Sequence, residues 1–448
     1  MRKIKFRANS ALLIGFMIVV GLCVYLIRLA DHGADWAMFS GNLGLYKNGI
    51  LNTGRVADRN GVVLAWAGDG KYGYADDETT RRACLHVVGD YPGNIGTGVI
   101  TSMADKIAGY SFMDGTYSRD GGGSTLRLTI DSDVCRTAYT ALSGRSGAVL
   151  VSNYETGEII CMVSSAGFDP AYQSASGAPA PASGAYLNKA ISSTYTPGSV
   201  FKIVTLAAAL ENIDGLYKRT FDCSGIVTIG YERINCSGVH GRQTIEEAFA
   251  NSCNSAFAVL SAELGPDTLA KYAESYGLTS SHSIDGIETA AGRFDKAEPD
   301  SGALAWSGIG QYNDLASPYS FLRLSTAIAN KGQAAESTLV SSYPLPANSQ
   351  AGLNKPVIMR ESTAVSLADM MSYNIIYSYG RDRFPGLDIY AKTGTAEVSN
   401  GYPHAWFTGF IKNPGHPLAF TVVVENGGSG LSAAGSVANA VLQAAVGN

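Results

Sequence analysis

The feature that most constrains this chain is an uncharged segment close to its N-terminus. Residues 9–27 carry no charged side chain, and residues 11–27 are almost wholly apolar. As a helix that rises ~1.5 Å per residue, this segment spans roughly 28 Å, enough to cross the hydrocarbon core of a bilayer. A cleavable signal peptide is the alternative, but the apolar run exceeds the ~7–15 residues of a signal core, and Arg28 disrupts the small-x-small pattern that ends at Ala30. We therefore expect an uncleaved transmembrane anchor over residues 10–29.

The charges around this segment predict its orientation. Four basic residues and no acid precede it: Arg2, Lys3, Lys5 and Arg7. Basic residues favour the cytoplasmic side of a membrane. Residues 1–9 are therefore expected to form a cytoplasmic tail, and everything after the anchor is expected outside the cytoplasm. We find no second apolar run of this length, so the sequence predicts a single-pass protein of the cell membrane.

The rest of the chain has the composition of folded, acidic domains. Its 448 residues are too many for one ordinary domain and sufficient for two. They are 46% hydrophobic and 16% charged, which provides a sizeable core and argues against extensive disorder. Without the four basic residues of the tail, 29 basic residues remain against 38 acidic ones, a net charge of −9. A body this acidic is a poor partner for nucleic acid, and we exclude that class of function.

Turn signals divide the chain into two expected domains. Asn60-Gly61 between apolar runs predicts a two-residue hairpin, and the glycine-rich stretch 121–124 predicts a flexible link. We place a mixed domain at 30–124 and a second domain at 125–448. In the second domain, periodicity and turn residues predict strands at 126–130, 147–152, 158–163, 387–398, 405–411 and 418–425, a loop at 174–185, and helices at 197–210, 245–264 and 433–446.

Six of the seven cysteines follow the anchor and lie where disulfides are permitted. The best single disulfide is Cys223–Cys236, across a probable hairpin that turns near Gly230; the alternative is that these are buried free thiols, and the sequence does not decide between them. No CxxC pair or His/Cys cluster along the sequence indicates a metal. The histidines are interpreted as surface or turn residues without a catalytic role: His32, His86, His240, His282, His404 and His416.

Ser199 and Lys202 form the first candidate catalytic pair. Pro197-Gly198 opens a predicted helix, because proline is favourable where a helix N–H has no partner in any case. Three residues apart, Ser199 and Lys202 would lie on one helical face within reach of each other. A serine hydroxyl needs a base to act as a nucleophile, and a desolvated lysine that stays neutral can serve. Alone, the pair could equally be a helix-start serine with a solvated lysine.

Ser252-Cys253-Asn254 is the second candidate motif, 53 residues after Ser199. Ser252 would relay a proton between Lys202 and a leaving group. Asn254 would orient a substrate amide. The alternative is an ordinary turn or cap, in which Ser-x-Asn is common.

Lys392-Thr393-Gly394-Thr395, in a predicted strand, is the third motif. Lys392 would attract a substrate carboxylate and tune the Ser252 proton, and Thr393 would bind that carboxylate. Gly394 would let a substrate backbone approach the strand. The N–H of Thr395 would form an oxyanion hole with that of Ser199, each such donor being worth roughly 3 kcal/mol. An exposed turn at a strand end is the alternative.

The three motifs are weak singly and specific together. They occur in order, each on the element that its role demands: a helix start, an interhelical turn and a strand. The same triple, with aspartate as a variant middle residue, is the signature of penicillin-binding proteins and class A β-lactamases.

With these residues, the chain resembles the monofunctional class B penicillin-binding proteins. Residues 54–65 are similar to the RGxIxDRNGxxLA segment of the N-terminal pedestal domain of that class. Departures are Lys189 and Thr53, where the family often has arginine. Further family-like segments are 147–149, 156–158, 168–170, Asn188, 196–199, His240-Gly241, 308–311 and 329–332.

The resemblance implies an α/β fold: a penicillin-binding/serine β-lactamase-like transpeptidase domain, with an antiparallel sheet flanked by helices, behind a mixed pedestal and one transmembrane helix. It implies that D-Ala-D-Ala stem peptides of peptidoglycan acylate Ser199 and are transferred to an amine on a neighbouring strand. It also implies inhibition by β-lactams, no metal or cofactor, and a SEDS-type glycosyltransferase partner in the membrane. The pedestal of about 95 residues leaves no room for the additional glycosyltransferase domain of class A proteins.

Two rival functions share this sequence pattern. A DD-carboxypeptidase or β-lactamase would use the same site, with water in place of the amine; a β-lactamase needs neither anchor nor pedestal. A non-catalytic β-lactam sensor or scaffold is the other rival, but about nine residues before the anchor leave little room for a signalling domain, and a scaffold need not keep all three motifs. A role in division, elongation or sporulation, the acceptor stem peptide and the β-lactam affinity stay open at this point.

Overall fold

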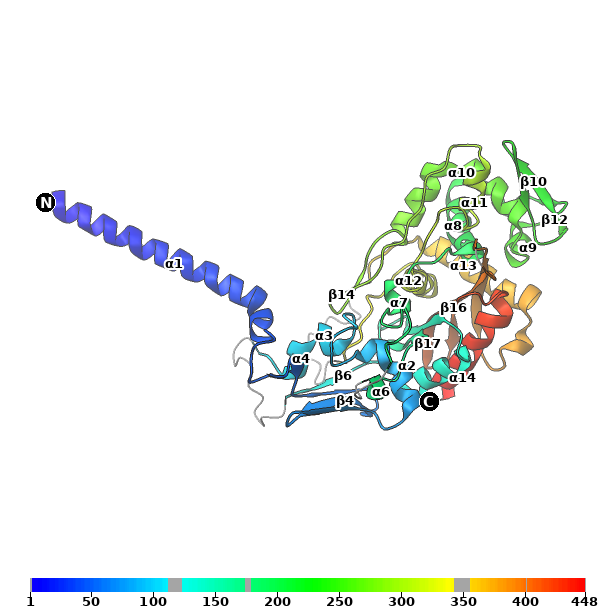
Figure 1. Cartoon of the computed structure of the whole chain (residues 1–448). Helices are drawn as coiled ribbons and strands as arrows, with labels where there is room; N and C mark the ends of the chain where they lie inside the picture. Colours follow the sequence, from blue (N-terminus) through cyan, green and yellow to red (C-terminus); the bar gives the residue numbers. More distant parts are fainter. Residues whose placement is uncertain (1, 112–122, 174–178, 342–354, 400, 448) are drawn as a thin grey trace.

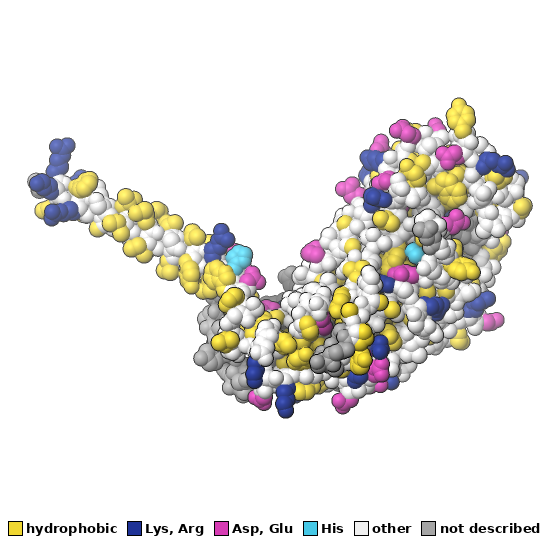
Figure 2. Space-filling model, viewed as in Figure 1, with side chains coloured by type: hydrophobic (Ala, Val, Ile, Leu, Met, Phe, Trp, Pro, Cys, Tyr) yellow, Lys and Arg dark blue, Asp and Glu magenta, His cyan; other side chains and the backbone are white. Residues whose placement is uncertain are grey.

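A computed structural model describes residues 2–111, 123–173, 179–341, 355–399 and 401–447. Helix α1 (Arg2–Ala37) extends away from the rest of the molecule, as Figure 1 shows. Apolar side chains cover its length, with Lys and Arg at its free end (Figure 2). Within the described ranges it is the one helix long and apolar enough to cross a membrane. The predicted anchor, 10–29, lies inside this helix.

The N-terminal region is built on a four-stranded sheet in the order β5-β4-β3-β6. β3 (Arg55–Ala57) and β4 (Val63–Gly68) form the hairpin predicted at Asn60-Gly61. The buried Asp58 carboxylate holds the turn by accepting hydrogen bonds from the N–H groups of Asn60 and Val62. Two small strands and three helices complete this region with β5 (Lys71–Tyr74): β1 (Tyr46–Lys47), β2 (Ile50–Leu51), α2 (Glu78–Val88), α3 (Val99–Ser102) and α4 (Ala104–Ala108).

The strand predicted at 126–130 is shorter and joins this N-terminal sheet. β6 (Thr125–Arg127) pairs in parallel with β3. Alternation of residue types along the chain indicates a strand but does not show which strand it pairs with. The sequence therefore did not show that this segment, placed in the second domain, pairs with β3. The domain limits 30–124 and 125–448 stay a prediction, and residues 121 and 122 of the predicted link lie outside the described residues.

The C-terminal region contains a five-stranded antiparallel sheet in the order β15-β16-β17-β7-β8. The five strands predicted along the sequence here are confirmed: β7 (Gly147–Asn153), β8 (Ile159–Ser165), β15 (Ile389–Ala396), β16 (His404–Asn413) and β17 (His416–Val424). β15 is at one edge and follows β7 in sequence by more than 200 residues. The long insertion between them forms the helical part of the molecule.

Both faces of this sheet are covered, which explains the nearly continuous apolar runs of its strands. On one face, Trp406 contacts Phe321 of α12 (Pro318–Ala329), and Thr408 hydrogen-bonds Ser325 of the same helix. Phe407 points to the opposite face, because side chains alternate along a strand, and there it stacks on Phe384. Helices α5 (Ser132–Leu142) and α14 (Ser436–Gly447) pack together beside the sheet (Figure 1).

The helical part centres on α8 (Lys202–Asn212) and α10 (Asn254–Ser275), which pack against each other. The helix predicted at 245–264 is two helices, because the chain turns at residues 251–253 between α9 (Ile245–Ala250) and α10. Of the predicted loop 174–185, residues 174–178 lie outside the described residues, and 179–185 contain no helix or strand. The remaining α-helices and strands are α6 (Pro170–Gln173), α7 (Lys189–Ser192), β9 (Phe221–Cys223), β10 (Ile226–Ile229), β11 (Glu232–Asn235), β12 (Gly241–Gln243), β13 (Ser283–Ile284), β14 (Ile287–Glu288), α11 (Gly302–Ser307) and α13 (Glu361–Asn374).

Candidate active site

Ser199 lies in a single 3₁₀ turn, Gly198–Phe201, that leads directly into α8. The predicted helix at 197–210 is thus confirmed, with a tighter first turn. Gly198 has a φ of +57°, and a Cβ there would meet the carbonyl oxygen of Thr395 at 2.5 Å. Glycine therefore allows the serine-bearing turn to pack directly on β15, because any side chain would separate the two.

Lys202 is fully buried one turn beyond Ser199. Its Nζ donates hydrogen bonds to Ser252 O at 2.5 Å, Asn254 Oδ1 at 2.7 Å and Ser252 Oγ at 3.2 Å. Burial lowers the pKa of Lys202 to about 8. At physiological pH, which is within about one unit of this pKa, a fraction of the amine is therefore neutral. A general base must be in this neutral state.

The Ser252-Cys253-Asn254 motif forms the turn between α9 and α10. A capping box at Thr244 and Glu247 starts α9. Ser252 then takes a left-handed conformation with φ +52°, and α10 begins at Asn254. A positive φ in a residue other than glycine is uncommon and persists where surrounding contacts impose it. Here it directs the Ser252 hydroxyl to the space between two lysines.

Lys392 is the second of these lysines and is also fully buried. Its Nζ donates to Ser252 Oγ at 3.0 Å and to Thr393 O at 3.0 Å. Burial, together with the charge of Lys202, holds the pKa of Lys392 well below its usual range. Among the described residues, no carboxylate forms an ion pair with either lysine. The role of Lys392 in binding a substrate carboxylate stays a prediction; its hydrogen-bond partners within the protein are Ser252 and the backbone.

An open cleft of about 420 Å³ lies above the two lysines. Five predicted site residues line it: Ser199, Ser252, Asn254, Thr393 and Thr395. Residues that the motifs did not indicate complete the lining: Asn235, Cys236, Ser237, Trp306, Ile309, Gln311 and Glu397. Ile309 and Gln311 lie in a family-like segment of the sequence, whereas nothing in the local sequence pointed to the residues of the β11 end, 235–237.

Gly394 contacts protein and does not line the cleft. A Cβ at this position would lie 3.0 Å from Pro197 O, from a Val200 methyl and from the Trp406 side chain. The predicted close approach at Gly394 is therefore made by the serine-bearing turn itself. Thr393 and Thr395, on the alternate positions of β15, face the cleft.

Tyr379 supports Thr393 and was not found from the sequence. Its hydroxyl lies 3.0 Å from Thr393 Oγ1 and accepts a hydrogen bond from Thr393 N at 3.1 Å. Burial raises the pKa of Tyr379 to about 12, so it stays a neutral hydroxyl. It fixes the orientation of a cleft-facing side chain on the edge strand.

The α/β fold and this serine–lysine site define a serine-dependent acyltransferase of the penicillin-recognising class. Residues 147–444 match the family model of the penicillin binding protein transpeptidase domain. Over 415 residues the chain is 29% identical to the peptidoglycan D,D-transpeptidase PbpA of Mycolicibacterium smegmatis, with 84% of each protein covered. The chain belongs to the penicillin-binding protein transpeptidase family, and it is a peptidoglycan D,D-transpeptidase of the class B type.

Solved structures agree with this assignment. The D,D-transpeptidase domain of a peptidoglycan glycosyltransferase from Eggerthella lenta is 28% identical, with a TM-score of 0.73 over 88% of this chain and 98% of that one. Penicillin-binding protein A of Mycobacterium tuberculosis is 25% identical, with a TM-score of 0.74 over 88% of this chain and 99% of that one. The predicted fold class is thereby confirmed.

Proposed function

We propose that this enzyme cross-links peptidoglycan stem peptides through an ester on Ser199. We also propose that the three motifs together transfer the Ser199 proton to the leaving amine. The observation that carries this assignment is the Ser252 hydroxyl, which lies 3.2 Å from Lys202 Nζ and 3.0 Å from Lys392 Nζ. Apolar residues would stabilise the fold better than two buried lysines around one hydroxyl. They are suited to moving a proton.

In the acylation step, Ser199 Oγ attacks the carbonyl carbon between the two terminal D-alanines, and its proton passes to neutral Lys202. The N–H groups of Ser199 and Thr395 stabilise the oxyanion. The carbon–nitrogen bond then breaks, and Lys202 returns the proton through Ser252 to the leaving amine. The product is an ester on Ser199 and free D-alanine.

In the transfer step, an acceptor amine takes the place of the departed D-alanine. Its nitrogen attacks the ester carbon and gives up a proton to the same lysine–serine pair. Ser199 Oγ leaves and recovers that proton. One peptide bond has been exchanged for another, so the reaction needs no external energy source.

The edge position of β15 supports binding of an extended donor peptide. β15 pairs with β16 on one side and is the last strand of its sheet. An extended peptide can add to such an edge through main-chain hydrogen bonds. The Thr393 and Thr395 hydroxyls would then meet its terminal carboxylate, Asn254 would orient its amide, and Lys392 would act through Ser252. A β-lactam presents the same carboxylate and amide, with a leaving group that stays attached.

The apolar helix α1 supports membrane anchoring with the catalytic region outside. We place residues 1–9 in the cytoplasm because their charges are basic. The pedestal would hold the cleft away from the membrane, where growing glycan strands are made. A SEDS-type glycosyltransferase is the partner that this arrangement fits.

Product analysis tests the proposal. Full-length protein in detergent is given lipid-linked precursor, a polymerising glycosyltransferase and a labelled D-amino acid. We expect cross-linked dimers and exchange of the label into stem peptides, and neither with Ser199→Ala. If only shortened stem peptides accumulated, the enzyme would be a carboxypeptidase.

A further inference from the structure

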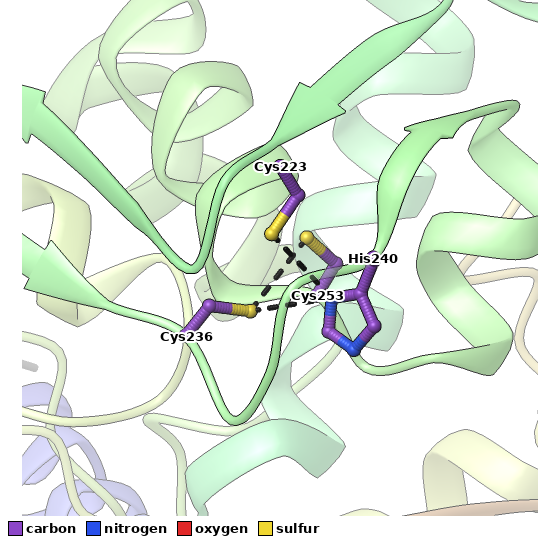
Figure 3. A group of neighbouring side chains, drawn as sticks. All are labelled: Cys223, Cys236, His240 and Cys253. Atoms are coloured by element: carbon purple, nitrogen blue, oxygen red, sulfur yellow. Dashed lines mark hydrogen bonds between the residues drawn. The ribbon is translucent and has the colours of Figure 1, made fainter.

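Four side chains with metal-binding atoms converge at Cys253, the residue that follows Ser252 (Figure 3). They are Cys223 at the end of β9, Cys236 just after β11, His240 just before β12, and Cys253 at the start of α10. Their three sulfurs and one ring nitrogen all lie within 4.8 Å of one another. Pairing of Cys223 with Gly241 across β9 and β12 is what brings His240 beside Cys223.

The separations are those of ligands around one small metal ion. Cys236 Sγ and Cys253 Sγ are 3.8 Å apart, and His240 Nδ1 lies 3.5 Å from both Cys223 Sγ and Cys236 Sγ. A tetrahedral Zn²⁺ with bonds of about 2.3 Å to sulfur and about 2.0 Å to nitrogen separates two sulfurs by about 3.8 Å, and sulfur from nitrogen by about 3.5 Å. These three separations agree with that geometry, and the other ligand pairs lie within 4.8 Å.

A disulfide does not account for the cluster. A sulfur–sulfur bond is about 2.0 Å long, and all seven cysteines are free thiols. Of the two alternatives left open by the sequence, the Cys223–Cys236 disulfide is wrong and the free thiols are found. A disulfide would also join only two of the three sulfurs. It would not explain why a third thiol and an imidazole lie within 4.8 Å of them.

The cluster is largely enclosed by protein, and one backbone N–H points at a sulfur. Cys223 and Cys253 are buried, and Cys236 is half-buried at the floor of the cleft. The backbone N–H of Asn254 donates to Cys236 Sγ at 3.2 Å, and the Cys223 thiol donates to Ser255 Oγ at 3.5 Å. An N–H donor such as that of Asn254 is typical of the groups around the ligands of a metal site, where it stabilises a thiolate.

We propose that Cys223, Cys236, His240 and Cys253 bind one Zn²⁺ in a closed, tetrahedral site. Sulfur and imidazole ligands favour zinc over magnesium or calcium, which prefer oxygen. Four protein ligands leave no open coordination position, so the site is structural and the ion takes no part in the chemistry. The site could not be predicted from the sequence, because the four ligands are separated by 12, 3 and 12 residues and include no CxxC pair.

The metal would position the second catalytic motif. Cys253 is the central residue of Ser252-Cys253-Asn254, and Cys236 follows Asn235, whose carbonyl accepts a hydrogen bond from Asn254 Nδ2 at 2.9 Å. The ion would therefore tie the β10–β11 hairpin to the start of α10 and hold Ser252 in its left-handed conformation. The four ligands are positioning residues.

Metal content tests the binding site without reference to catalysis. Full-length protein in detergent is given zinc, desalted and measured by elemental mass spectrometry. We expect about one zinc per chain in wild type and in Cys84→Ser, which alters a buried thiol outside the cluster, and at least tenfold less in Cys223→Ser and His240→Ala. Co²⁺ in place of zinc should give thiolate charge-transfer bands and the intense visible absorption of tetrahedral cobalt. Absence of metal in reconstituted wild type, equal zinc in all four proteins, or a disulfide within the cluster in the non-reduced protein would each overturn the proposal.

Acylation by labelled penicillin tests the positioning role and rests on the proposed function. We expect chelation to slow acylation at least tenfold, and zinc but not magnesium to restore it. His240→Cys, which offers a fourth sulfur, should keep both metal and acylation, whereas His240→Ala should lose both. An unchanged acylation rate in the metal-free enzyme would refute positioning. Ser199→Ala separates the two proposals, because it should keep its zinc while forming no adduct.

Discussion

The pH dependence of acylation follows from the burial of Lys202. If neutral Lys202 takes the Ser199 proton, the rate is proportional to the neutral fraction of an amine with a pKa of about 8. That fraction is ~1% at pH 6 and ~50% at pH 8, so the second-order rate constant for acylation should rise about 50-fold over this interval and level off above pH 9. The rate rises with pH because the neutral fraction of Lys202 rises, and it levels off near pH 9 because the pKa of Lys202 is lowered. With an unperturbed lysine, the rate would keep rising beyond pH 10.

Rapid-mixing measurements with a fluorescent penicillin give this rate constant, and the penicillin carboxylate stays ionised throughout the range. Lys202→Met should acylate orders of magnitude more slowly, because removing the partner of an activated nucleophile disables the pair. Thermal melts at each pH confirm that the folded protein is being measured. A rate constant that stays flat between pH 6 and 9 would show that Lys202 is not the base.

Four further outcomes are expected. Ser199→Ala should abolish the single penicillin adduct seen by intact-mass analysis and change the unfolding free energy by no more than ~1–2 kcal/mol; an adduct that persists would reassign the nucleophile. Gly198→Ala should lower stability in urea by ~1–3 kcal/mol, because its φ is positive and the new methyl would meet Thr395 O at 2.5 Å; a fully stable, active variant would contradict that packing. Lys392→Met should slow acylation strongly while leaving urea stability equal or higher, since it removes a buried unpaired amine; loss of stability with normal acylation would reverse the assignment. Protein beginning near Asp31 should be soluble without detergent and still bind penicillin, and N-terminal sequencing of the membrane-extracted protein should find residues before Asp31.

The candidate site residues could be predicted from the sequence because each motif carries its own local structure. Proline and glycine opened the turn before Ser199, and alternation placed the third motif in a strand. The burial of Lys392 could not be predicted in the same way. Thr393 and Thr395 on the same strand face the cleft, whereas the path of the Lys392 side chain depends on where α9 and α10 turn, 140 residues earlier.

The cysteine–histidine cluster escaped prediction for a related reason. Its members are far apart in sequence and come together through the register of β9 with β12 and through the break at Ser252. Neither feature has a local signature. The helical pattern over 245–264 does not show where the chain breaks at Ser252, so it does not show which residues lie beside Cys253.

The two lysines explain why the middle motif has a serine. Each Nζ lies within 3.2 Å of Ser252 Oγ, so the two nitrogens are within about 6 Å of each other. Two positive charges at that distance repel by about 3 kcal/mol at an effective dielectric constant of ~20, which corresponds to about two pKa units. This repulsion adds to the burial of Lys392 and helps to hold the pKa of Lys392 well below its usual range. In the proposed mechanism, a neutral Lys392 would keep Ser252 oriented without adding a second proton. The proton taken from Ser199 would then leave through Ser252 toward the leaving amine. The three motifs, separate in sequence, would thus work together on the same proton.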